Sequence, residues 1–235
     1  MIRKFCSLVF CVAASLLLLA GCSSHPPSAA QFMNVHEKRN KMGTSFIIGS
    51  SLRAGDIYKE HVDGESIQWD DYEGAEFYGN LDLSFLFRYN HLIVGFSVEN
   101  LSHRGVLGFV SRYIGLQSWG GLALKSFFPD KSASYGGLML IEEYPINENL
   151  KVGLSEHISH NAYQVDQINE GIDCSSSDYY NEYGIGTYLT YKGFSIEFRY
   201  GREIGEPRNR FYFMLNYAFR AKDKITSDFE LYNDY

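Results

Sequence analysis

Residues 193–220 read GFSIEFRYGREIGEPRNRFYFMLNYAFR, and this stretch decides the fold. On each side of a GEPRN turn, large apolar side chains alternate with small, polar or charged ones. A period of two over segments this long predicts a pair of antiparallel β-strands, each with one apolar and one polar face. The predicted apolar face comprises Phe194, Ile196, Phe198 and Tyr200 before the turn, and Phe211, Phe213, Leu215, Tyr217 and Phe219 after it.

The same alternation continues through most of residues 44–221. It predicts strands at 46–54, 77–88, 92–98, 135–144, 150–155 and 183–191. Between residues 105 and 128 glycines interrupt the pattern, which fits two strands with a turn near Ser118 or one long bulged strand. The chain is therefore predicted to be all-β, a closed antiparallel transmembrane β-barrel of ten strands, with eight as the alternative. Two polar stretches, 57–74 and 164–178, are predicted to be long loops.

Alternation alone does not say which face points outward. A soluble, lipocalin-like barrel would turn the apolar face inward. Four or five large side chains from every strand would overfill so small a lumen, whereas lipid sets no such limit. We therefore predict that the aromatic face contacts lipid and that Tyr89, Tyr144, Tyr191 and Phe219 lie at the interfaces. The lumen is then lined by a nearly balanced set of paired charges that leaves no open channel, namely Arg53, Asp82, Arg88, Glu99, Glu197, Arg199 and Arg220.

The N-terminus is predicted to be an export signal. Arg3 and Lys4 precede an apolar run from Leu8 to Leu19, and small residues follow. The sequence Leu19-Ala20-Gly21-Cys22 resembles the bacterial lipobox, which implies cleavage before Cys22, diacylation of its sulfur and, with Ser23 next, sorting to the outer membrane. The predicted organisation is a signal peptide at 1–21, a lipidated flexible tether at 22–43, the barrel at 44–221 and a charged C-terminal tail at 222–235.

The net charge and the cysteine content limit the possible partners and crosslinks of the protein. Cleavage after residue 21 would remove two basic and no acidic residues, leaving 19 Lys and Arg against 28 Asp and Glu, a formal charge of −9. So acidic a protein is a poor nucleic-acid binder. With Cys22 acylated, only Cys174 remains in the mature chain, so no internal disulfide can form. From a periplasmic tether, the turns at Asn90, Asn147 and Gly193 fall in the periplasm and the two longest loops fall outside.

One cluster suggests catalysis. His157-Ile158-Ser159 resembles the His-x-Ser motif of two families of outer-membrane barrel acyl hydrolases, the lipid A 3-O-deacylases and outer-membrane phospholipase A. The resemblance implies that His157 is a general base, Ser159 a nucleophile and Asp173 the orienting acid. The parity set by Leu150, Val152 and Leu154 instead turns His157 and Ser159 toward the lumen, unless a bulge near Ser155 reverses it.

The sequence therefore predicts an outer-membrane β-barrel lipoprotein with a structural or surface-interaction role and no catalytic activity. A membrane-lipid acyl hydrolase using His157 and Ser159 is the alternative, and a narrow ion pore is a third. The predicted partners are outer-membrane lipid and, at the outer loops, lipopolysaccharide or another envelope protein. We predict no cofactor, metal site or nucleic-acid partner.

Overall fold

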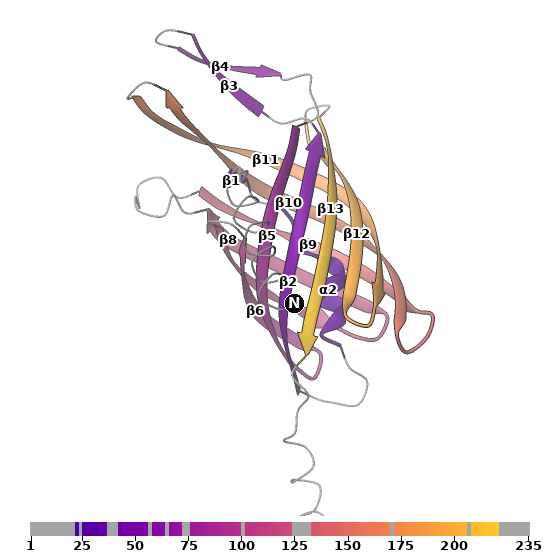
Figure 1. Ribbon diagram of the computed structural model, residues 1–235. Helices are drawn as coiled ribbons and strands as arrows, with labels where there is room; N and C mark the ends of the chain where they lie inside the picture. The colour runs from indigo at the N-terminus through magenta and orange to yellow at the C-terminus, as the bar shows by residue number, and fades with distance from the viewer. Residues whose placement is uncertain are drawn as a thin grey trace, which may run out of the picture.

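The barrel is closed by antiparallel strand pairs around its whole circumference (Figure 1). The computed structural model describes residues 22–23, 25–36, 42–55, 58–63, 66–71, 76–99, 102–123, 133–169, 172–205 and 208–220. Within these residues ten strands form the wall, and the pairings of β13 with β2 and of β9 with β10 close it. The ten-strand prediction is confirmed. The wall strands are β2 (Met42–Gly55), β5 (Glu76–Tyr89), β6 (Leu92–Glu99), β7 (Ser102–Val110), β8 (Ile114–Ala123), β9 (Ala133–Pro145), β10 (Leu150–Asn169), β11 (Ile172–Tyr191), β12 (Phe194–Glu203) and β13 (Asn209–Arg220).

The apolar face of the wall points outward, as the volume argument predicted. On β12, Phe198 is 47% exposed, whereas its neighbours Glu197 and Arg199 are 1% and 0% exposed. The strands around the wall repeat this parity, and bare apolar surface of this extent indicates contact with lipid. The four aromatic residues predicted at the interfaces are also exposed, and each lies at or next to the last residue of its strand. The structure is therefore a membrane barrel with a polar lumen.

The two ends of the barrel differ. At one end, which we call the turn end, the strands are joined by residues 90–91, 111–113, 146–149 and 192–193. Lys192 and Gly193 both have positive φ, +48° and +89°, as a two-residue hairpin turn with the right-handed twist of the strands requires. At the opposite, hairpin end, β10 and β11 project beyond the wall (Figure 1). β3 (Tyr58–Asp63) and β4 (Ser66–Asp71) form a separate hairpin at that end.

Three predicted connections differ in the structure. The prediction of a turn near Ser118 is wrong, because Ser118 lies within β8, paired with Leu107 and Leu138. The turn is at residues 111–113. The stretch 164–178, predicted as a loop, continues the ladder of β10 and β11 up to the Asn169–Ile172 pair. The predicted loop at 57–74 contains β3 and β4. Strands without an apolar face lack the period-two alternation, so in the sequence they resemble a loop.

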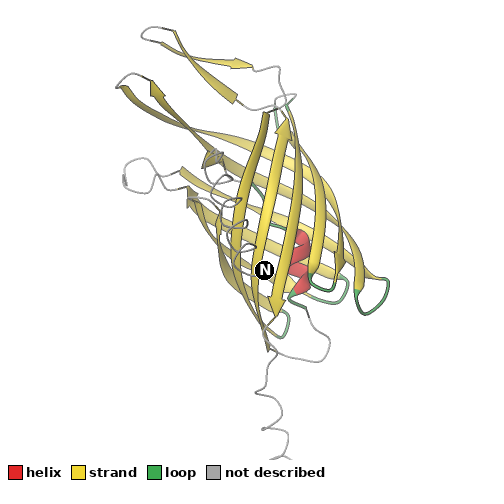
Figure 2. Ribbon diagram, in the orientation of Figure 1, coloured by secondary structure: helices red, strands yellow, loops and turns green. Residues whose placement is uncertain are grey.

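A segment of the chain occupies the lumen. Residues 25–36, called the lumen segment below, include the short helix α2 (Ala29–Asn34), which lies inside the barrel with all six residues buried (Figure 2). The prediction of a flexible tether is therefore wrong for residues 25–36. Small side chains and two prolines suit a confined lumen as well as they suit a linker. In the described part of the chain, no helix has the length and apolarity needed to cross a bilayer.

The remaining parts of the predicted organisation stay untested. The signal peptide at 1–21 and the charged tail at 222–235 lie outside the described residues. Of the first residues after the predicted cleavage site, the backbone of β1 (Cys22–Ser23) is described, and it pairs with β10. The acylation of Cys22 stays a prediction.

Candidate functional site

The predicted catalytic residues face the lumen. His157 and Ser159 lie two residues apart on β10 and are 6% and 3% exposed, inside the wall. The neighbour between them, Ile158, is 53% exposed on the lipid side. The inward parity predicted from Leu150, Val152 and Leu154 is thus what the structure shows, with β10 paired without interruption to both β9 and β11 near Ser155.

His157 takes its acidic partner from the neighbouring strand. Its Nε2 lies 3.0 Å from Glu182 Oε1, and the Tyr212 hydroxyl donates to Glu182 Oε2 at 2.8 Å. Ser159 Oγ accepts a hydrogen bond of 2.9 Å from Asn161 Nδ2. These groups form a buried polar cluster on the lumen side of the wall. An acyl ester in the surrounding lipid lies on the other side of the sheet.

Asp173 is not brought to this pair. Its backbone is opposite Ile168, eleven residues along β10 from His157, which is roughly 36 Å at about 3.3 Å per residue. Its side chain is outside the described residues. The separation arises because β10 and β11 continue as one long hairpin where a loop was predicted. Glu182, the register partner of Ser159, occupies the position proposed for the acid.

The lumen charges form a nearly balanced set, as predicted. Among the described side chains, five arginines and six carboxylates are buried. All the predicted charges except Arg220, whose side chain is not described, belong to this set. Five further buried charges were not predicted from the sequence: Arg104, Glu143, Glu182, Glu203 and Arg210. Arg104 lies where glycines obscured the alternation, and Glu203 and Arg210 lie at the ends of β12 and β13 that flank the GEPRN turn.

The first cluster holds the beginning of the lumen segment near the hairpin end. Arg104 donates to the carbonyl oxygen of His25 at 2.7 Å and to Asp82 Oδ2 at 2.7 Å. The His25 ring contacts Glu99 and, through Nε2, lies 2.8 Å from Ser51 Oγ. Arg104 Nη1 also lies 3.3 Å from Glu99 Oε2, so one arginine joins two wall carboxylates to the backbone of the segment.

The second cluster holds the start of α2. Arg199 pairs with Glu197 and donates to the carbonyl oxygens of Pro26 and Pro27. Glu197 in turn accepts a hydrogen bond of 2.7 Å from Ser28 Oγ, and the backbone N–H groups of Ala29 and Ala30 lie 3.3 Å from its two oxygens. A carboxylate at a helix N-terminus satisfies donors that have no partner within the helix.

A sequence signal for this helix was present. Ser28 caps α2, since its Oγ accepts a hydrogen bond of 3.2 Å from the backbone N–H of Gln31. Ser28 and Gln31 have the spacing of a capping box, and the apolar residues Phe32, Met33 and Val35 follow. The prolines before Ser28 favoured the interpretation as a linker.

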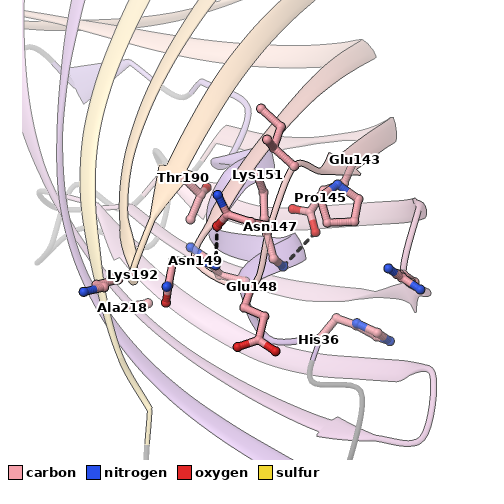
Figure 3. Close-up of a pocket in the computed structure, with 14 residues that line it drawn as sticks. His36, Glu143, Pro145, Asn147, Glu148, Asn149, Lys151, Thr190, Lys192 and Ala218 are labelled. Atoms are coloured by element: carbon pink, nitrogen blue, oxygen red, sulfur yellow. Dashed lines mark hydrogen bonds and ion pairs between the residues drawn. The ribbon is translucent and has the colours of Figure 1, made fainter.

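A pocket opens beneath the lumen segment at the turn end (Figure 3). Its volume is about 980 Å³, and it is lined by Asn34, His36 and residues of three connections of the wall. Two of the lining residues are paired, since Lys151 Nζ donates a hydrogen bond of 2.7 Å to Glu143 Oε1. Burial, with Arg88 nearby, lowers the pKa of His36 to about 4 at this end. In the described residues, no group of three or more His, Cys, Asp or Glu side chains is placed to hold a metal ion.

Comparisons with known proteins find only distant likeness. No family model matches the sequence, and no curated protein matches it significantly. Among solved structures, Neisserial surface protein A is similar at 13% identity and a TM-score of 0.40, over 75% of this chain and 97% of that one. Ail of Yersinia pestis, in complex with the heparin analogue sucrose octasulfate, is similar at 20% identity and a TM-score of 0.34, over 77% and 100%.

The N-terminal β-barrel domain of Pseudomonas aeruginosa OprF is similar at 11% identity and a TM-score of 0.32, over 75% of this chain and 99% of that domain. Likeness at this level transfers neither activity nor partner. The description of this chain as a membrane barrel depends on its own strand register and exterior.

Proposed function

We propose that this protein is a bacterial outer-membrane lipoprotein, acylated on Cys22, whose lumen is filled by its own N-terminal segment. Its role is structural or one of surface interaction, without catalysis. Outer-membrane lipid surrounds the wall, and lipopolysaccharide or another envelope protein contacts the hairpins. The short turns face the periplasm and the long hairpins face outward, in line with the usual asymmetry of such barrels.

The observation that carries this proposal is the occupied lumen. Helix α2 is buried on all sides, and wall arginines bind the backbone of residues that precede and follow it: Arg104 at His25, Arg199 at Pro26 and Pro27, and Arg88 at Val35. A transport pore would leave its axis to solvent. Here a segment of the chain lies along the axis, which supports a barrel closed to the passage of ions and solutes.

The acyl hydrolase alternative has less support. His157 and Ser159 face the lumen, and Asp173 is distant along the hairpin. Lipid reaches the outer face of β10, which at this level presents Ile158.

Two measurements test the proposal on detergent-purified, full-length protein. In planar bilayers we expect no conductance steps from the wild type, and steady ion current would contradict the closed barrel. On lipid A and on phospholipid we expect no release of fatty acid from the wild type or from Ser159→Ala. Release by the wild type that Ser159→Ala abolishes would reverse the assignment in favour of the hydrolase.

A further inference from the structure

The lumen segment crosses the barrel from one end to the other. Its first residue, His25, contacts Ser51, near the far end of β2, and Glu99, the last residue of β6 at the hairpin end. Near its last residue, the Val35 carbonyl oxygen accepts a hydrogen bond of 3.0 Å from Arg88, one residue from the end of β5 at the turn end. The direction of the chain is thus from the hairpin end to the turn end.

The contacts in between follow the same order. Ser28 Oγ accepts a hydrogen bond of 3.1 Å from Asn216, midway along β13. Phe32 and Met33 pack against the glycines of β7 and β8 that flank the turn at 111–113. His36 lines the pocket at the turn end, and β2 begins from that same end at Met42.

The residues before the lumen segment lie at the rim of the hairpin end. Cys22 pairs with Gln164 and Ser23 with Tyr163 on β10. The ladder between β10 and β9 ends at the His160–Gly136 pair, so β1 occupies the edge of β10 that β9 leaves open. The chain therefore leaves the lumen at the wall itself, next to the surrounding lipid.

We infer that the mature N-terminus is displayed at the hairpin end, opposite the point where β13 ends at Arg220. Together with the proposed acylation and orientation, on which this part depends, the acyl chains of Cys22 enter the outer leaflet of the outer membrane. Cys22 would be the first residue of the mature chain, so no residues precede it to span the roughly 30 Å of hydrocarbon to the inner leaflet. The lumen segment thereby connects the barrel wall to a lipid anchor at the cell surface.

Disulfide trapping tests the path of the chain independently of membrane orientation and acylation. In a Cys174→Ser background, we expect Ser23→Cys with Tyr163→Cys to crosslink under mild oxidation, because the two residues are register partners. The matched control combines Ser23→Cys with Asn149→Cys, at the turn end of the same hairpin. Crosslinking to Asn149→Cys, or to neither position in a barrel that folds, would overturn the inference.

Labelling of intact cells with a membrane-impermeant maleimide tests the orientation. We expect the native Cys174, on the projecting part of β11, to react in intact cells. In the Cys174→Ser background, Glu148→Cys should react only after the outer membrane is permeabilised. The reverse pattern would overturn the proposed orientation and with it the surface display, while a Ser23–Tyr163 crosslink would still support the path through the lumen.

Mass spectrometry of the N-terminal peptide tests the acyl group separately. An unmodified Cys22 together with the Ser23–Tyr163 crosslink would remove the lipoprotein part of the proposed function and leave the crossing intact. An acylated Cys22 without that crosslink would retain the lipoprotein and overturn the crossing.

Discussion

At the scale of single residues, arginines such as Arg104 and Arg199 each donate to several acceptors in the lumen. Arg199 is fully buried and joins Glu197 to the carbonyl oxygens of Pro26 and Pro27. Burying such charges is costly unless they are paired, so each partner depends on the other. The wall and the segment inside it are therefore coupled through a few guanidinium groups.

Removing one of these guanidinium groups should be strongly destabilising. Arg199→Met leaves Glu197 buried without its cation, and we expect the free energy of unfolding to fall by about 3–5 kcal/mol. Denaturant titration in detergent measures the loss. Arg202→Met, on the exposed side of the same strand, is the control and should have little effect. The double change Glu197→Gln and Arg199→Met should recover part of the loss, and equal losses in the single and double variants would contradict the coupling.

The titration of His36 should make stability depend on pH. Its pKa falls from 6.5 to about 4 in the folded protein, so the unfolded chain binds a proton first as the pH falls. This residue therefore reduces stability as the pH drops from about 6.5 to about 4. Between pH 7 and pH 5, the free energy of unfolding should fall less in His36→Gln than in the wild type. Equal falls in both proteins would show that His36 plays no part.

At the scale of elements, alternation predicted the wall and could not predict its contents. A strand with one face in lipid has a clear period of two, which is why the strand pair at 193–220 and two of its inward charges, Glu197 and Arg199, were predicted correctly. The lumen segment has a six-residue helix and no such period. Gly108 and Gly115 were interpreted as interruptions of the wall, whereas they give α2 the room it needs.

The glycines of the wall can be tested one at a time. A Cβ at Gly115 would lie 2.5 Å from Met33 Sδ, so Gly115→Val should force the buried Met33 side chain of α2 to shift and lower the temperature at which the barrel unfolds on heated gels. Gly120→Val is the matched control on the same strand, because its Cβ would meet only Tyr135 O at 3.8 Å on the outer side. The same shift in both variants would mean that the effect comes from strand propensity and not from the helix.

The candidate catalytic residues show where prediction from sequence ends. Parity along β10 placed His157 and Ser159 in the lumen correctly, because it depends only on local alternation. The pairing with Glu182 depends on the register between β10 and β11, which the polar stretch after Asn161 did not reveal. Asp173 was close in sequence and suitable in chemistry, yet a long hairpin carries it away from the pair.

At the scale of the whole molecule, the closed wall and its contents act as one unit. If the lumen segment is the barrier to ions, replacing residues 25–36 with a Gly-Ser chain of equal length should produce conductance steps in planar bilayers. The same replacement at residues 222–233 should leave the bilayer silent. Heat-modifiable gel migration shows which variants fold. A variant replaced at 25–36 that folds and gives no conductance steps would contradict the barrier role.

The pairing of β13 with β2, the last wall strand with the first, has a consequence for biogenesis. Residues 25–36 are synthesised before any wall strand, and in the finished protein they are enclosed by a hydrogen-bonded ring. A chain end acylated as we propose does not thread readily through a ring that is already shut. The late strands must therefore close around residues 25–36, and the ring can be completed by β13 and β2 only after this segment is in place.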